Sequence, residues 1–349
     1  MEATQKNNRD LAVDLIKTFA IVGVLLIHTA ASAYSTNALG SPSWYFALFW
    51  GSVSRASVPL FLMCSGVLFL SPQRELPGKK LWGRYILRIL AALFFWAALY
   101  KLYHLILGRN LSFGTLLSSC KELLAFQHES HLYYLHIVLL VYAFLPLLRL
   151  LTRYGSKRLV EYFLGLWFVL GILYPTVKGF WPFTLLSGVP TQWMMNMTYA
   201  SLGYVLLGYY LRRWPVCRGL SLSLLAVGFA VVFGLTAGFS LRQGSLNTQF
   251  WEGMTIGVCA MAAGIFSLFC SVQKIPSALA STAGFFSKAS FCVYLCHIVF
   301  LNTLQGLGLS PNWLTPLVGI PVLAALTMGC SLVVYLVASR IPVMRHWLI

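Results

Sequence analysis

The chain has 349 residues, of which 59% are hydrophobic and only 9% are charged, whereas ordinary soluble domains carry about 25% charged residues. This composition excludes a soluble globular protein. The formal net charge of +17 does not indicate a nucleic-acid partner either, because the basic residues follow the membrane topology described below.

Apolar runs near the length needed to cross a hydrocarbon core of about 30 Å succeed one another along the chain. Backbone groups in lipid must bond internally, and the alternating pattern of a barrel is absent, so the runs predict helices. We expect an all-α integral membrane protein, a single domain over 1–349 without a separate soluble domain, whose roughly ten spans form one bundle at 13–34, 44–71, 85–108, 133–151, 159–174, 194–211, 220–240, 251–271, 287–305 and 315–338.

The distribution of basic residues predicts that both termini are cytoplasmic. With the N-terminus inside, the inner loops hold most of the 25 Lys and Arg residues, beginning with Lys6 and Arg9. The outer half keeps only Arg55, Lys101, Arg109, Lys121, Lys178 and Arg242. This bias follows the positive-inside rule. A cleaved signal peptide is the alternative for the first run, but Asp14 and Lys17 interrupt its apolar region.

Lys17 and His28 lie eleven residues apart in the first span, so both point the same way, about 16 Å apart along a helix. Ionisable groups within a span are functional candidates. A neutral imidazole suits a general base, and Lys17 near the inner interface can bind a phosphate, oriented by Asp14 one turn earlier. The alternatives are a structural histidine and a lysine that snorkels to the head groups.

Arg55 lies inside the second span, at about the depth of His28. It must face a cavity or a partner. One role is to polarise a carbonyl or hold an anion beside His28. The other is a structural hydrogen bond to a helix end, since Pro59 one turn later frees a backbone carbonyl.

Arg84 and Arg88 open the third span on the inner side. Two arginines four residues apart face the same way on a helix and can clamp a pyrophosphate. Simple positive-inside charge explains them equally well.

Polar and aromatic side chains also mark the outer half of the bundle. His131 and Tyr134 begin the fourth span, and Tyr294 and His297 lie one turn apart in the ninth. They are candidates for substrate binding, with interfacial packing as the alternative. Glu252 can contact an acceptor, or it marks a helix start that suits the dipole. The long connections 109–132 and 175–193 could cap an outer cavity.

Several common catalytic signatures are missing from the sequence. It has no GxSxG, HExxH, Walker or GxGxxG motif and no Cys/His metal spacing. We therefore expect no serine hydrolase, no NTPase and no metal cofactor.

One ordered set of motifs runs over nearly the whole chain. It comprises Asp14-Leu-Ile-Lys17 and His28, Arg55-x3-Pro59-x-Phe61-x3-Ser65-Gly66, Arg84 and Arg88, His131-Leu-Tyr133-Tyr134-Leu135, Tyr204-x3-Gly208-Tyr209, and Ser290-Phe291-x2-Tyr294-x2-His297. The set resembles the acyltransferase-3 family of membrane acyltransferases, and most of all the short branch that includes the O-acetyltransferase of enterobacterial common antigen. Departures are Lys17 where the family usually has Arg, arginines spaced four apart rather than three, and Tyr134 in place of Trp.

The resemblance implies a multi-pass O-acetyltransferase of the bacterial inner membrane. Acetyl-CoA would bind at the inner face by Lys17, Arg84 and Arg88, and His28 and Arg55 would serve transfer to a hydroxyl of an extracytoplasmic glycan or lipid-linked sugar. The other expected partner is membrane lipid, and the sequence leaves open whether the chain forms an oligomer. The rival hypotheses are a transporter or flippase of a lipid-linked sugar or other anion, and a sensory or scaffolding membrane domain.

Overall fold

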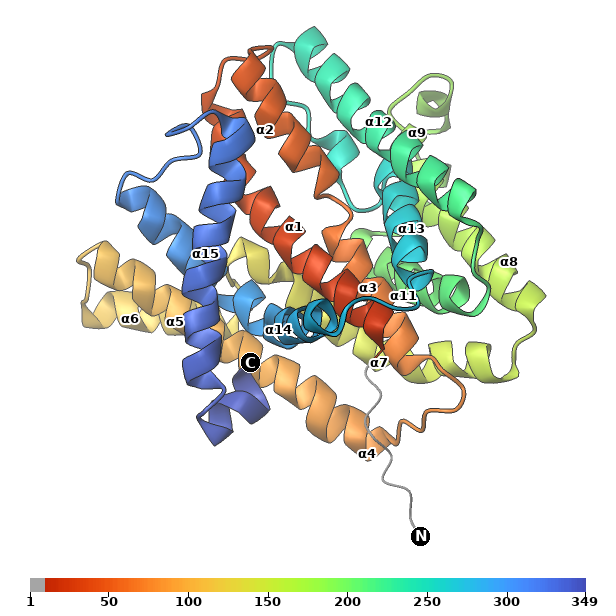
Figure 1. Ribbon diagram of the computed structural model, residues 1–349, viewed down its shortest axis with the longest axis horizontal. Helices are drawn as coiled ribbons and strands as arrows, with labels where there is room; N and C mark the ends of the chain where they lie inside the picture. Colours follow the sequence, from red (N-terminus) through yellow and green to blue (C-terminus); the bar gives the residue numbers. More distant parts are fainter. Residues whose placement is uncertain (1–9) are drawn as a thin grey trace.

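The computed structural model describes residues 10–349, and within that range the chain is helical without a strand (Figure 1). Lys6 and Arg9, which we assigned to the inner side, lie outside the described residues. The α-helices are α1 Leu11–Thr36, α2 Pro42–Val53, α3 Ser57–Phe69, α4 Gly78–Lys80, α5 Leu87–Leu107, α6 Phe113–Leu124, α7 Tyr133–Tyr154, α8 Lys157–Trp167, α9 Tyr174–Val177, α10 Val189–Trp193, α11 Met197–Arg213, α12 Arg218–Gln243, α13 Ile256–Cys270, α14 Ser277–Gly306 and α15 Pro316–Ala338.

Short segments of other helix types join these elements. Three are π-helical and three are 3₁₀-helical: η1 Leu81–Ile86, η2 Ser130–Leu132, η3 Phe168–Leu173, η4 Phe183–Leu186, η5 Gln249–Trp251 and η6 Met344–Leu348.

The bundle confirms the predicted all-α membrane protein. Among residues 10–349, nine helical stretches are long and apolar enough to cross a membrane, and each matches a predicted span. The remaining predicted span, 194–211, is α11, a helix of 17 residues with a largely buried sequence. It is shorter than the other nine and belongs to the core of the bundle.

The second predicted span is divided, which corrects the continuous helix expected over 44–71. Helix α2 ends at Val53 and α3 begins at Ser57, with Arg55 in the turn between them. Pro59 lies in the first turn of α3, where a proline is tolerated because the amide that it lacks has no intrahelical partner. The break brings Arg55 and its backbone to the inside of the bundle.

Helix α1 runs through the middle of the bundle and packs against α2, α3, α14 and α15 (Figure 1). Asp10 caps its first turn by accepting from the amides of Ala12 and Val13. The Thr18 hydroxyl donates to the Ala283 carbonyl at 3.0 Å and so joins α1 to α14. The central helix is thus in contact with most of the elements that could line a site.

The end of the bundle at which α1 begins is rich in arginine and lysine, and we call it the basic face. Arg212 at the end of α11 pairs with Asp10 at 2.8 Å. Arg149 near the end of α7 donates to the Phe69 carbonyl at the end of α3, at 2.5 Å, and to the carbonyl of Arg74. These bonds satisfy carbonyls that a helix end leaves open. Whether this face is cytoplasmic stays a prediction.

Helices α3 and α11 cross at a backbone-to-backbone contact that only glycine allows. A Cβ atom on Gly66 would lie 1.9 Å from the Val205 carbonyl oxygen, and one on Gly208 would lie 2.2 Å from the Met63 carbonyl oxygen. Such small-residue crossings are typical of membrane bundles.

We predict that Gly66→Ala destabilises the protein by about 1–3 kcal/mol, because the added methyl group overpacks a crossing of two backbones. The measurement is the thermal unfolding midpoint in detergent. The control is Gly234→Ala in α12, where no atom lies within 4 Å of the added Cβ. It should leave the midpoint unchanged or raise it, since alanine is the better helix former. Equal midpoints for the two variants would contradict the tight crossing.

Candidate active site

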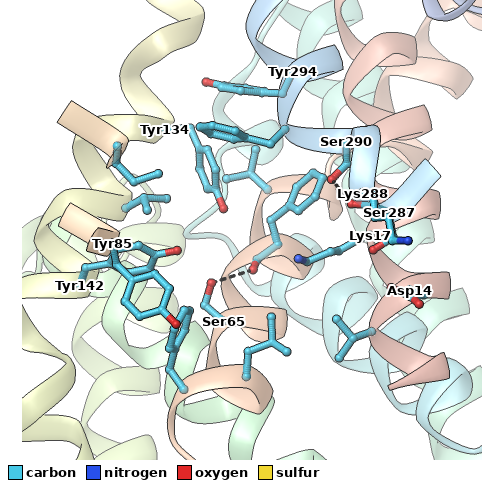
Figure 2. Close-up of a pocket in the computed structure, with 18 of the residues that line it drawn as sticks. Asp14, Lys17, Ser65, Tyr85, Tyr134, Tyr142, Ser287, Lys288, Ser290 and Tyr294 are labelled. Carbon is cyan, nitrogen blue, oxygen red and sulfur yellow. Dashed lines mark hydrogen bonds between the residues drawn. The ribbon is translucent and has the colours of Figure 1, made fainter. Parts of the chain in front are cut away.

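A cavity of about 470 Å³ extends into the bundle from the basic face (Figure 2). Its size falls within the range of about 300–1,000 Å³ found for ligand sites. The lining comes from α1, α3, α5 with η1, α7 and α14, and the residues are Asp10, Val13, Asp14, Lys17, Val24, Val58, Phe61, Ser65, Leu68, Phe69, Tyr85, Arg88, Ile89, Tyr134, Val138, Tyr142, Ser287, Lys288, Ser290, Phe291 and Tyr294.

Lys17 enters this cavity from α1. Figure 2 shows its ammonium group pointing into the space, toward the side of α3 that carries Ser65. Asp14, one turn earlier, is buried and also lines the cavity. Lys288 at the rim is exposed. Lys17 therefore lines an inward-facing cavity, and its side chain is not directed only at the head groups.

Of the two arginines expected to act together, only Arg88 lines the cavity. Its guanidinium donates to the Ile349 carbonyl and lies 5.8 Å from the ring of Phe291. Arg88 Nε has no hydrogen-bond partner in the described part of the chain. Arg84 lies in the π-helical η1, is exposed and is not part of the lining. The structure therefore separates the pair that ideal α-helical spacing placed side by side.

Tyrosines line the cavity from its mouth to its inner end. Tyr85 and Tyr142 pack on each other with ring centroids 6.3 Å apart, and Arg74 donates to the Tyr85 hydroxyl at 3.4 Å. At the inner end the rings of Tyr134 and Tyr294 lie edge to face at 5.5 Å. The lining stops at this pair.

Behind Tyr294 lies a cluster of three histidines. The ring of His297 lies 5.0 Å from that of His28 and 5.6 Å from that of His131. The cluster joins three segments that are distant in sequence, because His28 is on α1, His131 in η2 and His297 on α14. The Tyr294 hydroxyl donates to the His131 carbonyl and so ties the cavity end to the cluster.

Two nitrogens of this cluster are buried without a partner. His297 Nδ1 lies 2.6 Å from the Tyr294 carbonyl oxygen, so Nδ1 carries the proton and Nε2 is an open acceptor. In the described part of the chain, Nε2 of His297 and Nε2 of His131 have no hydrogen-bond partner. Such groups are costly to bury. Both atoms can therefore form a hydrogen bond with a ligand that reaches the cluster.

His28 lies one turn beyond Val24, the last α1 residue of the cavity lining, and is not part of that lining. The ring is directed into the bundle, against His297, and not into lipid. Tyr294, which lines the cavity, also lies in ring contact with His297. The site thus has a cavity on one side and a histidine cluster next to it, with the tyrosine pair at their junction.

Arg55 borders the cluster from the α2–α3 turn. Its guanidinium lies 4.1 Å over the ring of Trp251, and its Nε donates to the Gly51 carbonyl at 3.1 Å. The side chain is within electrostatic range of His28. The structural hydrogen bond expected of Arg55 is thus present, while its role beside His28 stays a prediction. The carbonyl is that of Gly51, not the one freed by Pro59.

A second pocket, of about 320 Å³, lies at the opposite end of the bundle from the basic face. Glu252 lines it together with Pro175, Lys178, Met194, Met195, Asn196, Met197, Gln249, Met254 and Thr255. Trp251, the neighbour of Glu252, is the residue that stacks on Arg55 and donates to the Ser52 hydroxyl at 3.0 Å. This pocket therefore borders the Arg55 side of the histidine cluster.

A model of the acyltransferase-3 family, described as an acyltransferase domain, matches residues 10–336. This chain belongs to the acyltransferase-3 family. No curated protein and no solved structure matches it. As a family member with nine candidate spans among residues 10–349, the chain is a multi-pass membrane acyltransferase.

Several residues that line the cavity had no role in the sequence analysis. Ser65, Tyr85 and Ser287 line the cavity but were not assigned a role. A signal did exist on α14, where Ser287, Ser290, Tyr294 and His297 recur at the three- and four-residue spacings of one helix face. That face is the wall between α1 and α7.

Proposed function

We propose that this acyltransferase moves an acetyl group from cytoplasmic acetyl-CoA to a hydroxyl of an extracytoplasmic glycan or lipid-linked sugar at the bacterial inner membrane. The single observation that supports this most is the cavity that begins among basic side chains and ends beside a buried histidine cluster. Membership of an acyltransferase family supports acyl transfer as the reaction. The two-sided arrangement suits a donor from one face and an acceptor from the other.

The donor side rests on Lys17 and Arg88. Both line the cavity near its mouth, and cations are what a nucleotide's phosphates require. Beyond them the wall is mostly apolar with tyrosine and serine hydroxyls, which suits a thin chain that carries amides and a thioester. Arg84, exposed near the mouth, can add only long-range attraction.

In the proposed reaction His28 is the general base. It takes the proton of the acceptor hydroxyl while that oxygen attacks the thioester carbonyl carbon. The carbon–sulfur bond then breaks, and CoA leaves as a thiolate that takes up a proton. Arg55 stabilises the negative charge on the carbonyl oxygen. The open Nε2 atoms of His131 and His297 accept hydrogen bonds from neighbouring hydroxyls of the acceptor and so position it, while the reacting hydroxyl donates its one proton to His28.

The acetyl group must pass the end of the cavity to reach His28. The proposal therefore requires the Tyr134 and Tyr294 rings to part when the donor binds. Loop and side-chain movements that complete a site on substrate binding are common in enzymes. A closed junction in the absence of donor also keeps water from the thioester.

The acceptor side rests on the second pocket. Glu252 and Gln249 place a carboxylate and an amide in its lining. Such groups, with Asn196 beside them, suit the hydroxyls of a sugar. We propose that this pocket anchors a part of the acceptor next to the reacting hydroxyl.

We predict that His28→Ala lowers acetyl transfer by about 10²–10⁴-fold, the usual contribution of a general base. The assay measures labelled acetyl passing from acetyl-CoA to an envelope glycan extract with purified protein. His346→Ala, at an exposed histidine of η6, is the matched control and should keep full activity. Wild-type transfer by His28→Ala would remove His28 from its role. Substrate movement in vesicles without CoA would instead favour a transporter.

We predict that Arg88→Gln raises the KM for acetyl-CoA about 10-fold or more, because a charge-assisted phosphate contact contributes about 1.5–3 kcal/mol. Arg84→Gln is the matched control, since the same residue type is lost one turn away but outside the cavity. It should change KM less than about threefold, as expected for a contribution of at most about 0.5 kcal/mol away from specific contacts. Equal effects of both substitutions would show that only the total charge of the face matters.

We predict that Glu252→Ala raises the KM for the glycan acceptor about 10-fold, from the loss of hydrogen bonds to a charged group. The KM for acetyl-CoA should not change, because the donor cavity is separate. Glu75→Ala, at an exposed glutamate near the basic face, is the control and should change neither constant. An unchanged acceptor KM in Glu252→Ala would contradict the pocket's role while leaving the donor side intact.

A further inference from the structure

Helix α6, within the connection expected to be an outer loop, is folded back against a membrane-spanning helix (Figure 1). It starts shortly after α5 ends, yet Phe126, just past its last turn, packs against Phe94 in the first half of α5 with ring centroids 5.4 Å apart. Helix α6 therefore runs antiparallel to the last turns of α5. It therefore lies alongside that part of α5.

Left-handed backbone at each end of α6 makes this reversal possible. Arg109 has φ 50° and Phe126 has φ 59°, values uncommon for residues other than glycine. After each of them an amide closes the preceding helix, with Asn110 N donating to the Leu105 carbonyl and Gln127 N to the Glu122 carbonyl. The fold thus keeps two residues in the energetically unfavourable left-handed conformation, one on each side of α6, where the chain turns to place α6 against α5.

The side of α6 that faces away from the protein is apolar. Phe113 is 83% and Leu124 73% exposed, with Leu116 and Leu117 also exposed. Together with the exposed Cys120, these residues repeat at the spacing of one helix stripe. A soluble helix places such a stripe on the core, whereas no residue of α6 is buried.

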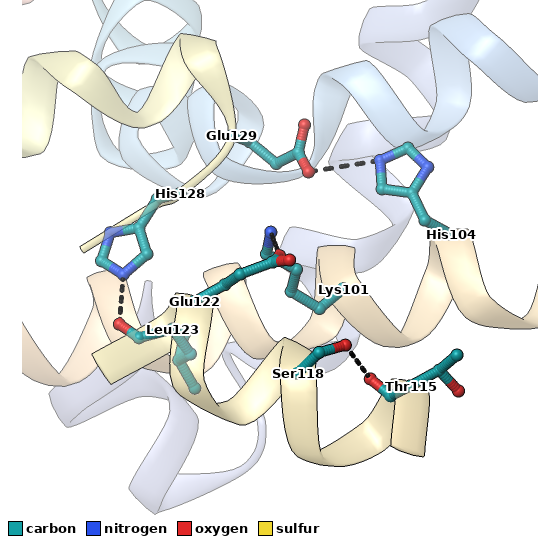
Figure 3. Close-up of polar contacts among 8 residues, drawn as sticks. All are labelled: Lys101, His104, Thr115, Ser118, Glu122, Leu123, His128 and Glu129. Carbon is teal, nitrogen blue, oxygen red and sulfur yellow. Dashed lines mark hydrogen bonds and ion pairs between the residues drawn. The ribbon is translucent and has the colours of Figure 1, made fainter. Parts of the chain in front are cut away.

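The opposite side of α6 faces paired polar groups (Figure 3). Glu122 forms an ion pair with Lys101 of α5 at 2.5 Å, and His104 of α5 pairs with Glu129 in the loop after α6 at 3.2 Å. Pairing of this kind is what ionisable groups need inside a membrane.

A histidine pair continues the polar side into the loop that precedes η2. His128 Nδ1 lies 3.3 Å from His136 Nε2 on α7, and His128 Nε2 lies 3.0 Å from the Leu123 carbonyl oxygen at the end of α6. These contacts join α6, its loop and α7. Every ionisable partner that the structure gives α6 and its loop therefore lies on the protein side.

We propose that the apolar stripe of α6 lies on the acyl chains of the lipid leaflet opposite the basic face. The stripe continues the exposed apolar surface of the spanning helix α5, where Leu99, Leu102 and Ile106 are also exposed. Lys121 lies beside the stripe, and its long side chain carries the ammonium to the head groups. Helices α5 and α6 thus form a helical hairpin whose second helix contacts lipid. Helix α6 also holds the loop that leads to His131 against the bundle.

Cys120 lies in the stripe and provides the probe for a test. The protein, with Cys217, Cys270 and Cys330 changed to serine, is labelled at Cys120 with the fluorophore NBD and placed in phosphatidylcholine vesicles. We expect strong loss of fluorescence with doxyl-labelled acyl chains and little loss with aqueous iodide. The matched control carries Cys120→Ser and Asn110→Cys, which moves the label to the turn before α6. The label at position 110 should be quenched strongly by iodide and little by the doxyl-labelled acyl chains.

Two outcomes would overturn the proposal. Iodide quenching at position 120 as strong as at position 110 would place the stripe in water. Protection of the label from both quenchers, together with a Cys120–Cys120 disulfide formed between copies of the unlabelled protein under mild oxidation, would place a second chain there instead. The label at position 120 is carried by a native exposed thiol. Both proteins share the same three serine substitutions, and an unchanged thermal unfolding midpoint shows that they are folded. Neither result bears on acyl transfer.

Discussion

A charged or hydrogen-bonding group inside an apolar bundle must have a partner, because neither hydrocarbon nor a packed core supplies one. The fold meets this demand at helix ends, where Arg149 fills open carbonyls of the segment after α3, and inside, where the Tyr100 hydroxyl donates to the Leu295 carbonyl at 2.9 Å. Among the buried side-chain atoms without a partner in the described part of the chain, Nε2 of His131 and Nε2 of His297 belong to one cluster of packed rings. A ligand that reaches this cluster can supply the hydrogen bonds that the protein does not.

Much of the fold follows from apolar length alone. A run of about 20 apolar residues can do little except cross the bilayer as a helix, and each predicted span has a helix in the structure. The break at Arg55 was also encoded, since Pro59 marks the first turn of a new helix. We interpreted that proline as freeing a carbonyl within one helix. Helix α6 was missed because a 12-residue segment is too short for a span. The spacing of its apolar residues is visible in the sequence, but its packing against α5 is not.

The candidate site was predictable along each helix and unpredictable between helices. Periodicity placed Lys17 and His28 on one stripe of α1 and Tyr294 and His297 on one face of α14. It could not show that these faces meet, since that depends on how α1 packs against α14. Arg84 and Arg88 show the converse limit. An ideal helix aligns them, but η1 is π-helical, and only Arg88 lines the cavity.

The junction at Tyr134 and Tyr294 has a physical purpose in the proposed reaction. A passage that joined the basic face to the opposite face at all times would let water reach the thioester and let protons cross the membrane. A cavity that ends one turn of α1 before His28 avoids both. The Tyr294 hydroxyl is bonded to the His131 carbonyl and its ring lies beside His297, so any movement of Tyr294 that admits the donor also shifts the groups that would hold the acceptor. In the proposed reaction, the movement that opens the donor cavity would therefore also assemble the acceptor side. The bond from Tyr294 to His131 would couple the two.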